Sequence, residues 1–314
     1  MATIDLSTPT PAPAGTLDGL PRRLALTLPE LHLLAEKAGG APLPFELTEP
    51  EPKQGNALED RLGKSRSSVE DETYAAALDS LHEAADALTR RGLLVDGAAD
   101  TAVVGALGLL ATPSVAVDID LNIGGVRAKA WHRQRGTAVA TLATTDGIVF
   151  ELAWFEAAHW PGELGRVAVL PEEQAQSGDQ HTSRVPGMVD FPRELLDAGV
   201  EAVRSNRTDL LPTIIAHHGG AAIDADGQPL GDLEVASVIQ SLVSETEGRL
   251  RVLVADVSTE EVQTVGVLSW VLVADGWRSL RPHRDDDVHR VEVRAVQPSD
   301  LAAELGPVLA EVTP

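Results

Sequence analysis

Apolar residues recur at helical spacing early in each half of this chain and then change to an alternating pattern. In residues 72–91 they return every three or four positions, which predicts an amphipathic helix, and residues 101–111 predict a shorter one. Val115, Val117 and Ile119 then alternate with polar or small residues, the pattern of a strand buried on one face. Further strands are predicted at 126–134, 137–144, 148–155 and 166–170.

The second half follows the same order of helices and then strands. Helices are predicted at residues 191–203, 209–218 and 234–243, and strands at 250–257, 262–274, 277–280 and 289–296. A terminal helix is predicted to begin at Pro298, because apolar side chains after it share one helical face: Leu301, Leu305, Val308, Leu309 and Val312.

Two hairpin turns suggest that the halves are copies of one unit. Asp146-Gly147 and Asp275-Gly276 are turn signals, and residues 249–257 with 264–280 resemble 114–121 with 136–152 around them. Residues 290–298 likewise resemble 166–171. The sequence therefore predicts an α+β fold in which a unit of helices, about four strands and a helix occurs twice. The alternative is two unrelated mixed segments that share a common hairpin turn.

The expected organisation follows from this duplication. Residues 1–23, rich in Thr, Pro and Ala, are expected to form a disordered leader. Residues 24–180 and 181–314 form the two halves, which we expect to fold into one compact domain. Thr27 and Glu30 have the spacing of a capping box and predict a helix start. The acidic segment 49–68 is expected to be a loop, and its role is not assigned.

The chain is strongly acidic, with 48 Asp and Glu against 25 Lys and Arg and a formal net charge of −23. Such a chain repels phosphate backbones and anionic membranes, which argues against nucleic-acid binding. No apolar run reaches the roughly 18 residues of a membrane span, and the N-terminus does not resemble a signal peptide. We therefore expect no membrane insertion, a cytoplasmic location, and a monomer or weak dimer.

Catalytic motifs are absent from the sequence. The chain has no cysteine, no glycine-rich phosphate loop and no nucleophile elbow. The densest polar cluster runs from His283 through three aspartates to His289, and two histidines with three carboxylates are able to bind a metal ion. A solvated, charged loop is the simpler interpretation. We predict a protein that is not an enzyme, without catalytic residues, cofactor or metal, and keep a metal-dependent enzyme using residues 283–289 as the alternative.

The second half also predicts a protein-binding surface. Tryptophan is enriched at interfaces, and this chain is poor in aromatic residues. Trp270 and Trp277, together with Val235, Ile239 and Leu242 of the helix predicted at 234–243, are the candidate binding residues. The alternative for all five is packing in the core.

Three stretches of the chain resemble the EspG family, the type VII (ESX) secretion-associated chaperones of actinobacteria. Residues 26–35 with 43–47 are similar to that family's opening helix and strand. Residues 88–94, carrying Arg-Gly-Leu-Leu, lead into residues 109–117, carrying Leu-Ala-Thr-Pro and a strand. The third stretch is the duplicated sheet unit, which ends in residues 293–312.

The resemblance implies an α+β fold, a quasi-two-fold duplicated unit whose central, mostly antiparallel sheet is flanked by helical bundles. It also implies a non-enzymatic chaperone that recognises a helical type VII secretion substrate in the cytosol and keeps it soluble before export. The partners it implies are PE/PPE-like or WXG-type helical proteins. No catalytic residue is implied by this family. An unrelated regulatory binding domain is the remaining alternative.

Overall fold

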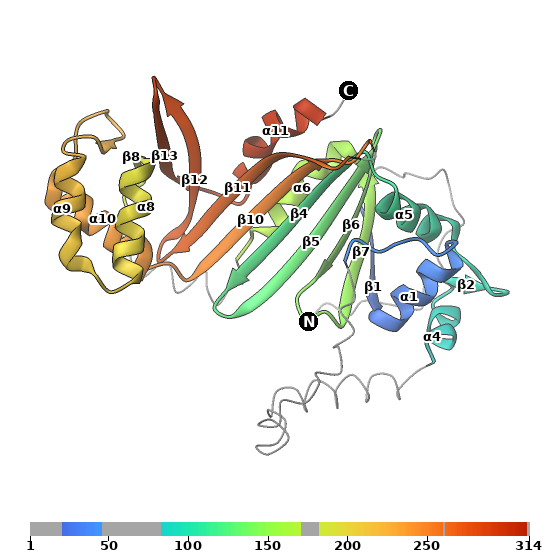
Figure 1. Ribbon diagram of the computed structural model, residues 1–314. Coiled ribbons are helices and arrows are strands. Elements are labelled where there is room, and N and C mark those ends of the chain that lie inside the picture. Colours follow the sequence, from blue (N-terminus) through green and yellow to red (C-terminus); the bar gives the residue numbers. More distant parts are fainter. Residues whose placement is uncertain (1–20, 46–82, 171–181, 260, 313–314) are drawn as a thin grey trace, which may run out of the picture. The chain divides into compact units, whose positions relative to one another are not determined.

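The computed structural model describes residues 21–45, 83–170, 182–259 and 261–312 (Figure 1). The first half contains four helices of one turn or more and seven strands in the described residues, with these bounds: β1 (Arg22–Thr27), α1 (Leu28–Lys37), α4 (Ala84–Arg90), β2 (Leu94–Val95), β3 (Ala98–Ala99), α5 (Thr101–Ala111), β4 (Val115–Ile123), β5 (Val126–Arg135), β6 (Ala138–Thr144), β7 (Val149–Glu156) and α6 (Trp160–Val167).

The second half opens with a strand and helices and continues with four long strands and a terminal helix. Its elements are β8 (Met188–Pro192), α8 (Arg193–Arg204), α9 (Leu211–His217), β9 (Ile223–Asp224), α10 (Asp232–Ser244), β10 (Gly248–Asp256), β11 (Gln263–Val273), β12 (Gly276–Asp285), β13 (Val288–Val296) and α11 (Asp300–Val312).

The chain separates into two compact units. Unit 1 contains Met1–Ser114 and Trp131–His159, and unit 2 contains Val115–Ala130 and Trp160–Pro314, so the chain passes between them before β4, within β5 and before α6. The strand order is β1-β7-β6-β5 in unit 1 and β5-β4-β10-β11-β12-β13-β8-β9 in unit 2. Neighbouring strands pair antiparallel, as where Ile119 of β4 lies opposite Val252 of β10. We retain the division at residue 180 only as a proposal for where one copy of the repeat ends.

The duplication is visible in the strand order. Counted outward from the β4–β10 pair, the strands are β5-β6-β7-β1 in one direction and β11-β12-β13-β8 in the other. Each half begins with the outermost of these strands and a helix (β1 and α1, β8 and α8), and each ends in a helix after its fourth central strand (α6, α11). The predicted α+β class, with a duplicated unit and a large antiparallel sheet, is confirmed.

The strand order also corrects the alignment of the two copies that the sequence suggested. Asp275-Gly276 joins β11 to β12, whereas Asp146-Gly147 joins β6 to β7, so the two turns are not equivalent. The counterpart of the first-half turn is the one between β12 and β13, where Asp286 adopts a φ of 48°. The sequence alignment matched two turns of the same chemistry that occupy different positions in the repeat.

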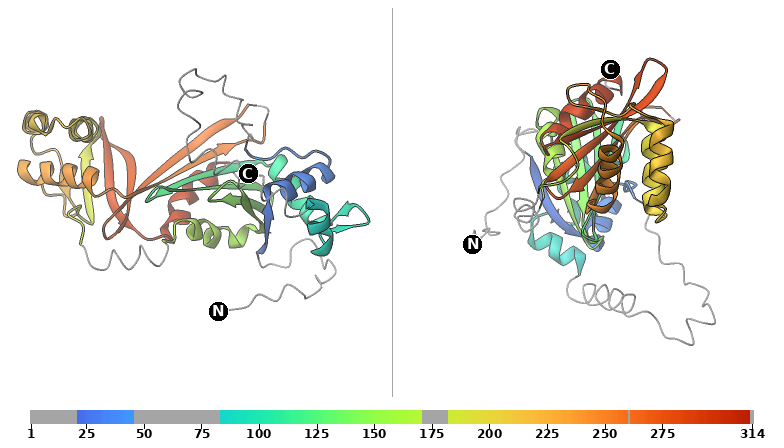
Figure 2. Two further views of the ribbon diagram at one scale, coloured as in Figure 1. Left: turned by 90° about the horizontal axis from the view of Figure 1, so that it is seen from below. Right: turned by 90° about the vertical axis from the view of Figure 1, so that its left-hand side faces the viewer.

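The strand predicted at 166–170 is wrong, because this segment belongs to helix α6 and its end. Trp160, Leu164 and Ala168 are buried and spaced by four residues, so they form one apolar helical face. This face outweighs the short strand-like pattern of residues 167–170, and the segment folds as a helix. Gly165 allows α6 to approach α11, since a Cβ there would lie 3.1 Å from the Pro298 carbonyl oxygen. Figure 2 shows α6 and α11 side by side on one side of the strands.

Each unit has its own hydrophobic core. In unit 1, Leu31 and Leu34 of α1 pack with Leu107 of α5 and Leu152 of β7. The predicted capping box at the start of α1 is confirmed, with the Thr27 amide donating to Glu30 Oε2 at 2.8 Å and the Glu30 amide donating to Thr27 Oγ1 at 3.4 Å. In unit 2, helices α8, α9 and α10 pack on one another and on β13 and β8. No helix of the described residues is long and apolar enough to cross a membrane.

The predicted hairpin turn at Asp146 is confirmed and makes a testable electrostatic prediction. Burial tends to raise the pKa of Asp146, but hydrogen bonds from the Val149 and Ile148 amides and the Thr144 hydroxyl outweigh it and hold this pKa below its usual value. A carboxylate with a lowered folded-state pKa stabilises the protein above its unfolded-state pKa, and this contribution is lost as the pH falls through the folded-state value.

Asp146→Ala is therefore expected to reduce the free energy of unfolding by about 1 kcal/mol at pH 7. The difference from the wild type should shrink as the pH falls below about 4, the usual pKa of an aspartate, and through the lower folded-state pKa of Asp146. Urea unfolding of both proteins at pH 7 and pH 3 measures it. A difference that is equally large at both pH values would show that the charge of Asp146 does not matter.

Candidate protein-binding surface

The five residues proposed from sequence as binding residues lie in the core of unit 2. Trp270 and Trp277 are 1% and 2% exposed, and Val235, Ile239 and Leu242 are also buried. Their side chains are covered by the chain itself, so in this conformation they do not offer a contact surface. The core alternative describes their positions.

The two tryptophans hold α11 and the end of α6 against the strands by hydrogen bonds from their indole N–H groups. Trp270 Nε1 donates to Glu304 Oε2 of α11 at 2.9 Å, and Ser279 Oγ donates to the same oxygen at 3.0 Å. Trp277 Nε1 donates to the Ala168 carbonyl oxygen at 2.9 Å. Buried indole N–H groups need such partners, so both residues have a structural role. Val235, Ile239 and Leu242 similarly hold α10 against α8, where a Cβ on Gly199 would lie 2.8 Å from Ile239 Cδ1.

The histidine–aspartate cluster is the end of the β12–β13 hairpin and not an irregular loop. Strand β12 extends to Asp285, well beyond the predicted end at residue 280, and pairs with β13 through Asp285 opposite Val288. His283 lies opposite Arg290, so His289, one residue away on the same strand, points to the other face. The two histidines therefore do not converge on one point.

His283 instead contacts a buried ion pair of Asp190 with Arg290, which the sequence did not reveal. Its Nε2 lies 3.1 Å from Asp190 Oδ1, and Arg290 Nε donates to Asp190 Oδ2 at 2.7 Å. Arg290 Nη2 also donates to the carbonyl oxygens of Asp190 and Ala221. In the described residues, no group of three His, Asp or Glu side chains is arranged to hold a metal ion. The alternative of a metal-dependent enzyme required these side chains to converge on one point, and in this structure they do not.

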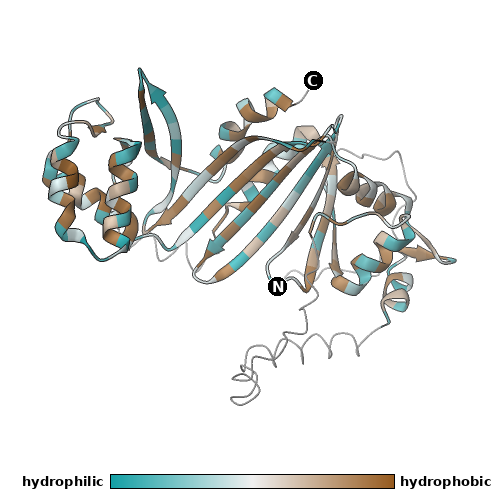
Figure 3. Cartoon of the chain, in the orientation of Figure 1, coloured by the Kyte–Doolittle hydropathy of each residue, from teal (hydrophilic) through white to brown (hydrophobic). Residues whose placement is uncertain are grey.

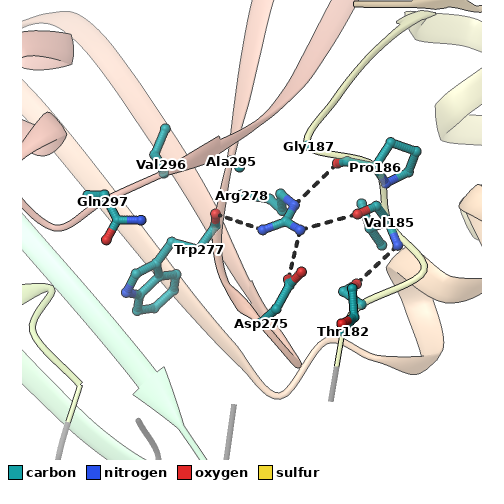
Figure 4. Close-up of a pocket in the computed structure, with 11 residues that line it drawn as sticks. Thr182, Val185, Pro186, Gly187, Asp275, Trp277, Arg278, Ala295, Val296 and Gln297 are labelled. Atoms are coloured by element: carbon teal, nitrogen blue, oxygen red, sulfur yellow. Dashed lines mark hydrogen bonds and ion pairs between the residues drawn. The ribbon is translucent and has the colours of Figure 1, made fainter. Parts of the chain in front are cut away.

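A hollow of about 410 Å³ lies beside the β11–β12 turn (Figure 4). Its principal charged group is Arg278, which is buried and donates to the carbonyl oxygens of Val185, Pro186 and Trp277 and to Asp275 Oδ1 at 2.7 Å. The Arg278 guanidinium therefore donates its hydrogen bonds to acceptors of the protein itself. We interpret Arg278 as an anchor for residues 182–187 and not as a ligand-binding group.

One face of the unit 2 strands is buried and the other is exposed. Leu250, Val252 and Val254 of β10 are at most 1% exposed, and α11 packs over β10 and β11 on this side. The alternate residues Arg249 and Arg251 point to the opposite face and are exposed. Figure 1 shows β4 and β10 with no helix drawn in front of them, and Figure 3 shows hydrophilic and hydrophobic positions alternating along both strands.

The exposed face carries cationic side chains in two rows across β5, β4 and β10. Lys129, Asp120 and Arg251 form one row: Lys129 Nζ lies 3.9 Å from Asp120 Oδ1, and Asp120 is the cross-strand partner of Arg251. In the adjacent row, Asn122 is opposite Arg249. Arg127 is two residues from Lys129 on β5 and therefore on the same face. Asp118, two residues before Asp120, lies opposite Leu253 and on the same face. We call this surface the open face, defined by Asp118, Asp120, Asn122, Arg127, Lys129, Arg249, Arg251, Leu253, Val267 and Ser269.

The open face has the features of a protein-binding surface. Four exposed cations stand against two carboxylates, Asp120 and the half-buried Asp118, although the chain as a whole carries a net charge of −23. Beside them, Leu253 of β10 is opposite Val267 of β11, and Val267 is 47% exposed. An apolar strip beside positive charge matches a partner with an apolar contact and acidic neighbours. Alternation along β4 pointed to an exposed face, but only the strand pairing shows which cations gather on it.

Comparison with known proteins identifies the fold. No family model matches the chain, and no curated protein matches it. Among solved structures, the chain is similar to the Mycobacterium tuberculosis type VII secretion system chaperone EspG5, determined in complex with the PE25-PPE41 dimer. The TM-score is 0.56 at 12% sequence identity, and the match covers 93% of this chain and 97% of that chain. At this identity the likeness shows that the two chains share a fold.

Proposed function

We propose that this protein is a non-enzymatic cytosolic chaperone that binds a helical type VII secretion substrate and keeps it soluble before export. The observation that carries this proposal is the match to EspG5 over nearly the full length of both chains, since that protein is a type VII secretion system chaperone solved in complex with the PE25-PPE41 dimer. The duplicated fold is compatible with the same function.

The partner that fits the open face is a helical protein with an apolar tip bordered by acidic residues. Such a tip tends to aggregate when it is left in water, and covering it keeps the protein soluble. Leu253 and Val267 offer the apolar contact, while Arg127, Arg249 and Arg251 attract the acidic border. A PE/PPE-like pair is the substrate we favour, with WXG-type helical proteins as the second class.

Co-expression tests the function directly. The tagged protein is expressed with candidate PE–PPE pairs and with WXG-type pairs, recovered by affinity purification and resolved by size-exclusion chromatography with light scattering. We expect one chaperone bound to one substrate pair, and substrate that is soluble only when the chaperone is present. Recovery of the chaperone without any of these proteins, despite soluble expression of both, would refute the proposal.

A further inference from the structure

One buried arginine joins three segments of unit 2. Arg290 of β13 is 7% exposed, and its Nε donates to Asp190 Oδ2 of β8 at 2.7 Å. Its Nη2 donates to the Asp190 carbonyl oxygen at 3.2 Å and to the Ala221 carbonyl oxygen at 2.9 Å. Ala221 belongs to the segment between α9 and α10, residues 218–231, which we call the α9–α10 connection. The guanidinium therefore binds this connection to β8 and β13.

The contact lies on the face of β8 and β13 opposite to the one that α8, α9 and α10 cover. Val189 and Phe191 of β8 belong to the core beneath these helices, so Asp190 between them points to the other face. The chain that leaves α9 thus reaches the opposite face at Ala221. The helices pack on the strands from one face, and Arg290 holds their connection from the other.

Few other contacts hold the α9–α10 connection. Its strand β9 has two residues and pairs with β8 only through Asp224 opposite Val189 and Ile223 opposite Asp190. Gly220, directly before Ala221, has a φ of 70°, and glycine adopts many backbone conformations at little cost. Burial of Ala222 completes the attachment. The hydrogen bond from Arg290 is therefore one of a small set of restraints on the position of the connection.

The position of the connection affects the border of the open face. Helix α10 begins directly after the connection, at Asp232, and leads into β10 at Gly248. Val271 of β11 belongs to the same buried cluster as Leu242 of α10, and it lies opposite Arg249 of the open face. Helix α10 therefore borders the open face. Movement of the connection is transmitted to this border, because the connection and α10 are continuous in the chain.

We propose that Arg290 is a positioning residue for client capture. By binding the Ala221 carbonyl oxygen, it keeps the α9–α10 connection and α10 in the arrangement that the client meets at the open face. Asp190 provides the buried counter-charge, and the partly exposed His283 lies against it, with Nε2 3.1 Å from Asp190 Oδ1. The role in capture rests on the proposed chaperone function, whereas the attachment of the connection does not.

Arg290→Lys tests the attachment in the chaperone alone. Lysine keeps a positive charge beside Asp190, but one ammonium group does not reproduce the planar fork that reaches both Asp190 and Ala221. We expect the backbone amides of residues 219–224 to exchange with deuterium at least about tenfold faster than in the wild type, because a hydrogen bond to a charged group is lost. Hydrogen exchange of the full-length protein, read by mass spectrometry, measures this.

The same variant tests the role in capture. The probe is the PE–PPE or WXG-type pair that co-purifies with the wild type. Its affinity for Arg290→Lys should fall about five- to tenfold, because only the molecules with the connection in place bind it. By linkage, a client that prefers this arrangement also stabilises it, so exchange at residues 219–224 should return to near the wild-type rate in the complex. An arginine with only a structural role would not show this recovery.

Arg91→Lys is the matched control in unit 1. Arg91 donates to the carboxylate of Glu30 and to the carbonyl oxygen of Ala25, the same two kinds of acceptor that Arg290 binds. The Glu30 side chain is 8% exposed, against 7% for Asp190. This variant should change neither the exchange at residues 219–224 nor the affinity for the client pair. Thermal melts verify that both variants fold.

Each part of the proposal has a result that would overturn it. Unchanged exchange at residues 219–224 in Arg290→Lys would show that Arg290 does not hold the connection. Faster exchange with unchanged client affinity would remove the role in capture, and an equal loss of affinity in Arg91→Lys would indicate general destabilisation. If the wild type captures no pair, the proposed function fails and the role in capture fails with it. Exchange in the chaperone alone then still decides whether Arg290 holds the connection.

Discussion

The double variant Arg249→Glu/Arg251→Glu is expected to lose capture of its helical client while it remains folded. Both side chains are exposed on the open face, on either side of Leu250, whose side chain is buried on the opposite face. Their replacement leaves the buried face untouched and reverses the charge where an acidic partner would approach. Like charges brought together at an interface weaken binding by several kcal/mol, so affinity should fall at least about a hundredfold.

The control carries the same change in charge elsewhere. Arg135 and Arg204 are exposed and lie outside the open face, at the ends of β5 and α8. Arg135→Glu/Arg204→Glu should capture the client as well as the wild type in the same pull-down. If both double variants lose capture equally, the overall charge and not the open face controls binding. If neither loses it, the open face is not the binding surface, although the chaperone function itself can still hold.

Substitution of Gly248 by alanine is expected to have the largest effect on stability. Gly248 starts β10, where its strand neighbours are Ile123 of β4 and Leu272 of β11. A Cβ at this position would lie 2.9 Å from the Asn122 carbonyl oxygen, 3.0 Å from Ile123 Cγ1 and 3.2 Å from Leu272 Cβ. The closest of these is backbone, which cannot rotate away. The strands must separate, at the pair where the two copies of the repeat meet.

We expect Gly248→Ala to reduce the free energy of unfolding by about 1–3 kcal/mol, the usual cost of overpacking. The matched control is Gly108→Ala in α5, where a Cβ would meet nothing within 4 Å. That change should be neutral or stabilise by up to about 1 kcal/mol, since alanine favours a helix over glycine. Thermal unfolding of both variants measures the difference. Equal melting temperatures would show that the β4–β10 pair relaxes without cost.

The periodic elements were predictable because their patterns are long. The alternation at Val115, Val117 and Ile119 predicted β4, and the capping pair Thr27 and Glu30 predicted the start of α1. The outer strands β1 and β8 were missed, since each is short and runs directly into a helix. The helix predicted at 72–91 coincides with α4 in its last turns, and its earlier residues lie outside the described part of the chain.

The candidate sites were less accessible from sequence. Tryptophans in strands are found both in cores and at interfaces, so the sequence does not distinguish the two. The structure assigns Trp270 and Trp277 to the core, because Glu304 and the Ala168 carbonyl accept hydrogen bonds from their indole N–H groups. No sequence pattern around Asp190 indicates that it is buried in an ion pair. Its partners His283 and Arg290 are about a hundred residues away in the chain, and only the pairing of β8 with β13 brings them together.

By itself the sequence determined the class of the fold, its duplication, and the absence of familiar catalytic motifs, because these depend on composition and on local periodicity. The tertiary structure decided which face of each strand is covered, which turns of the two copies are equivalent, and where β11 parts from β12. Those properties arise from contacts between distant residues. An alternating strand specifies that one of its faces is exposed, but the neighbours that share this face are chosen only when the strands pair.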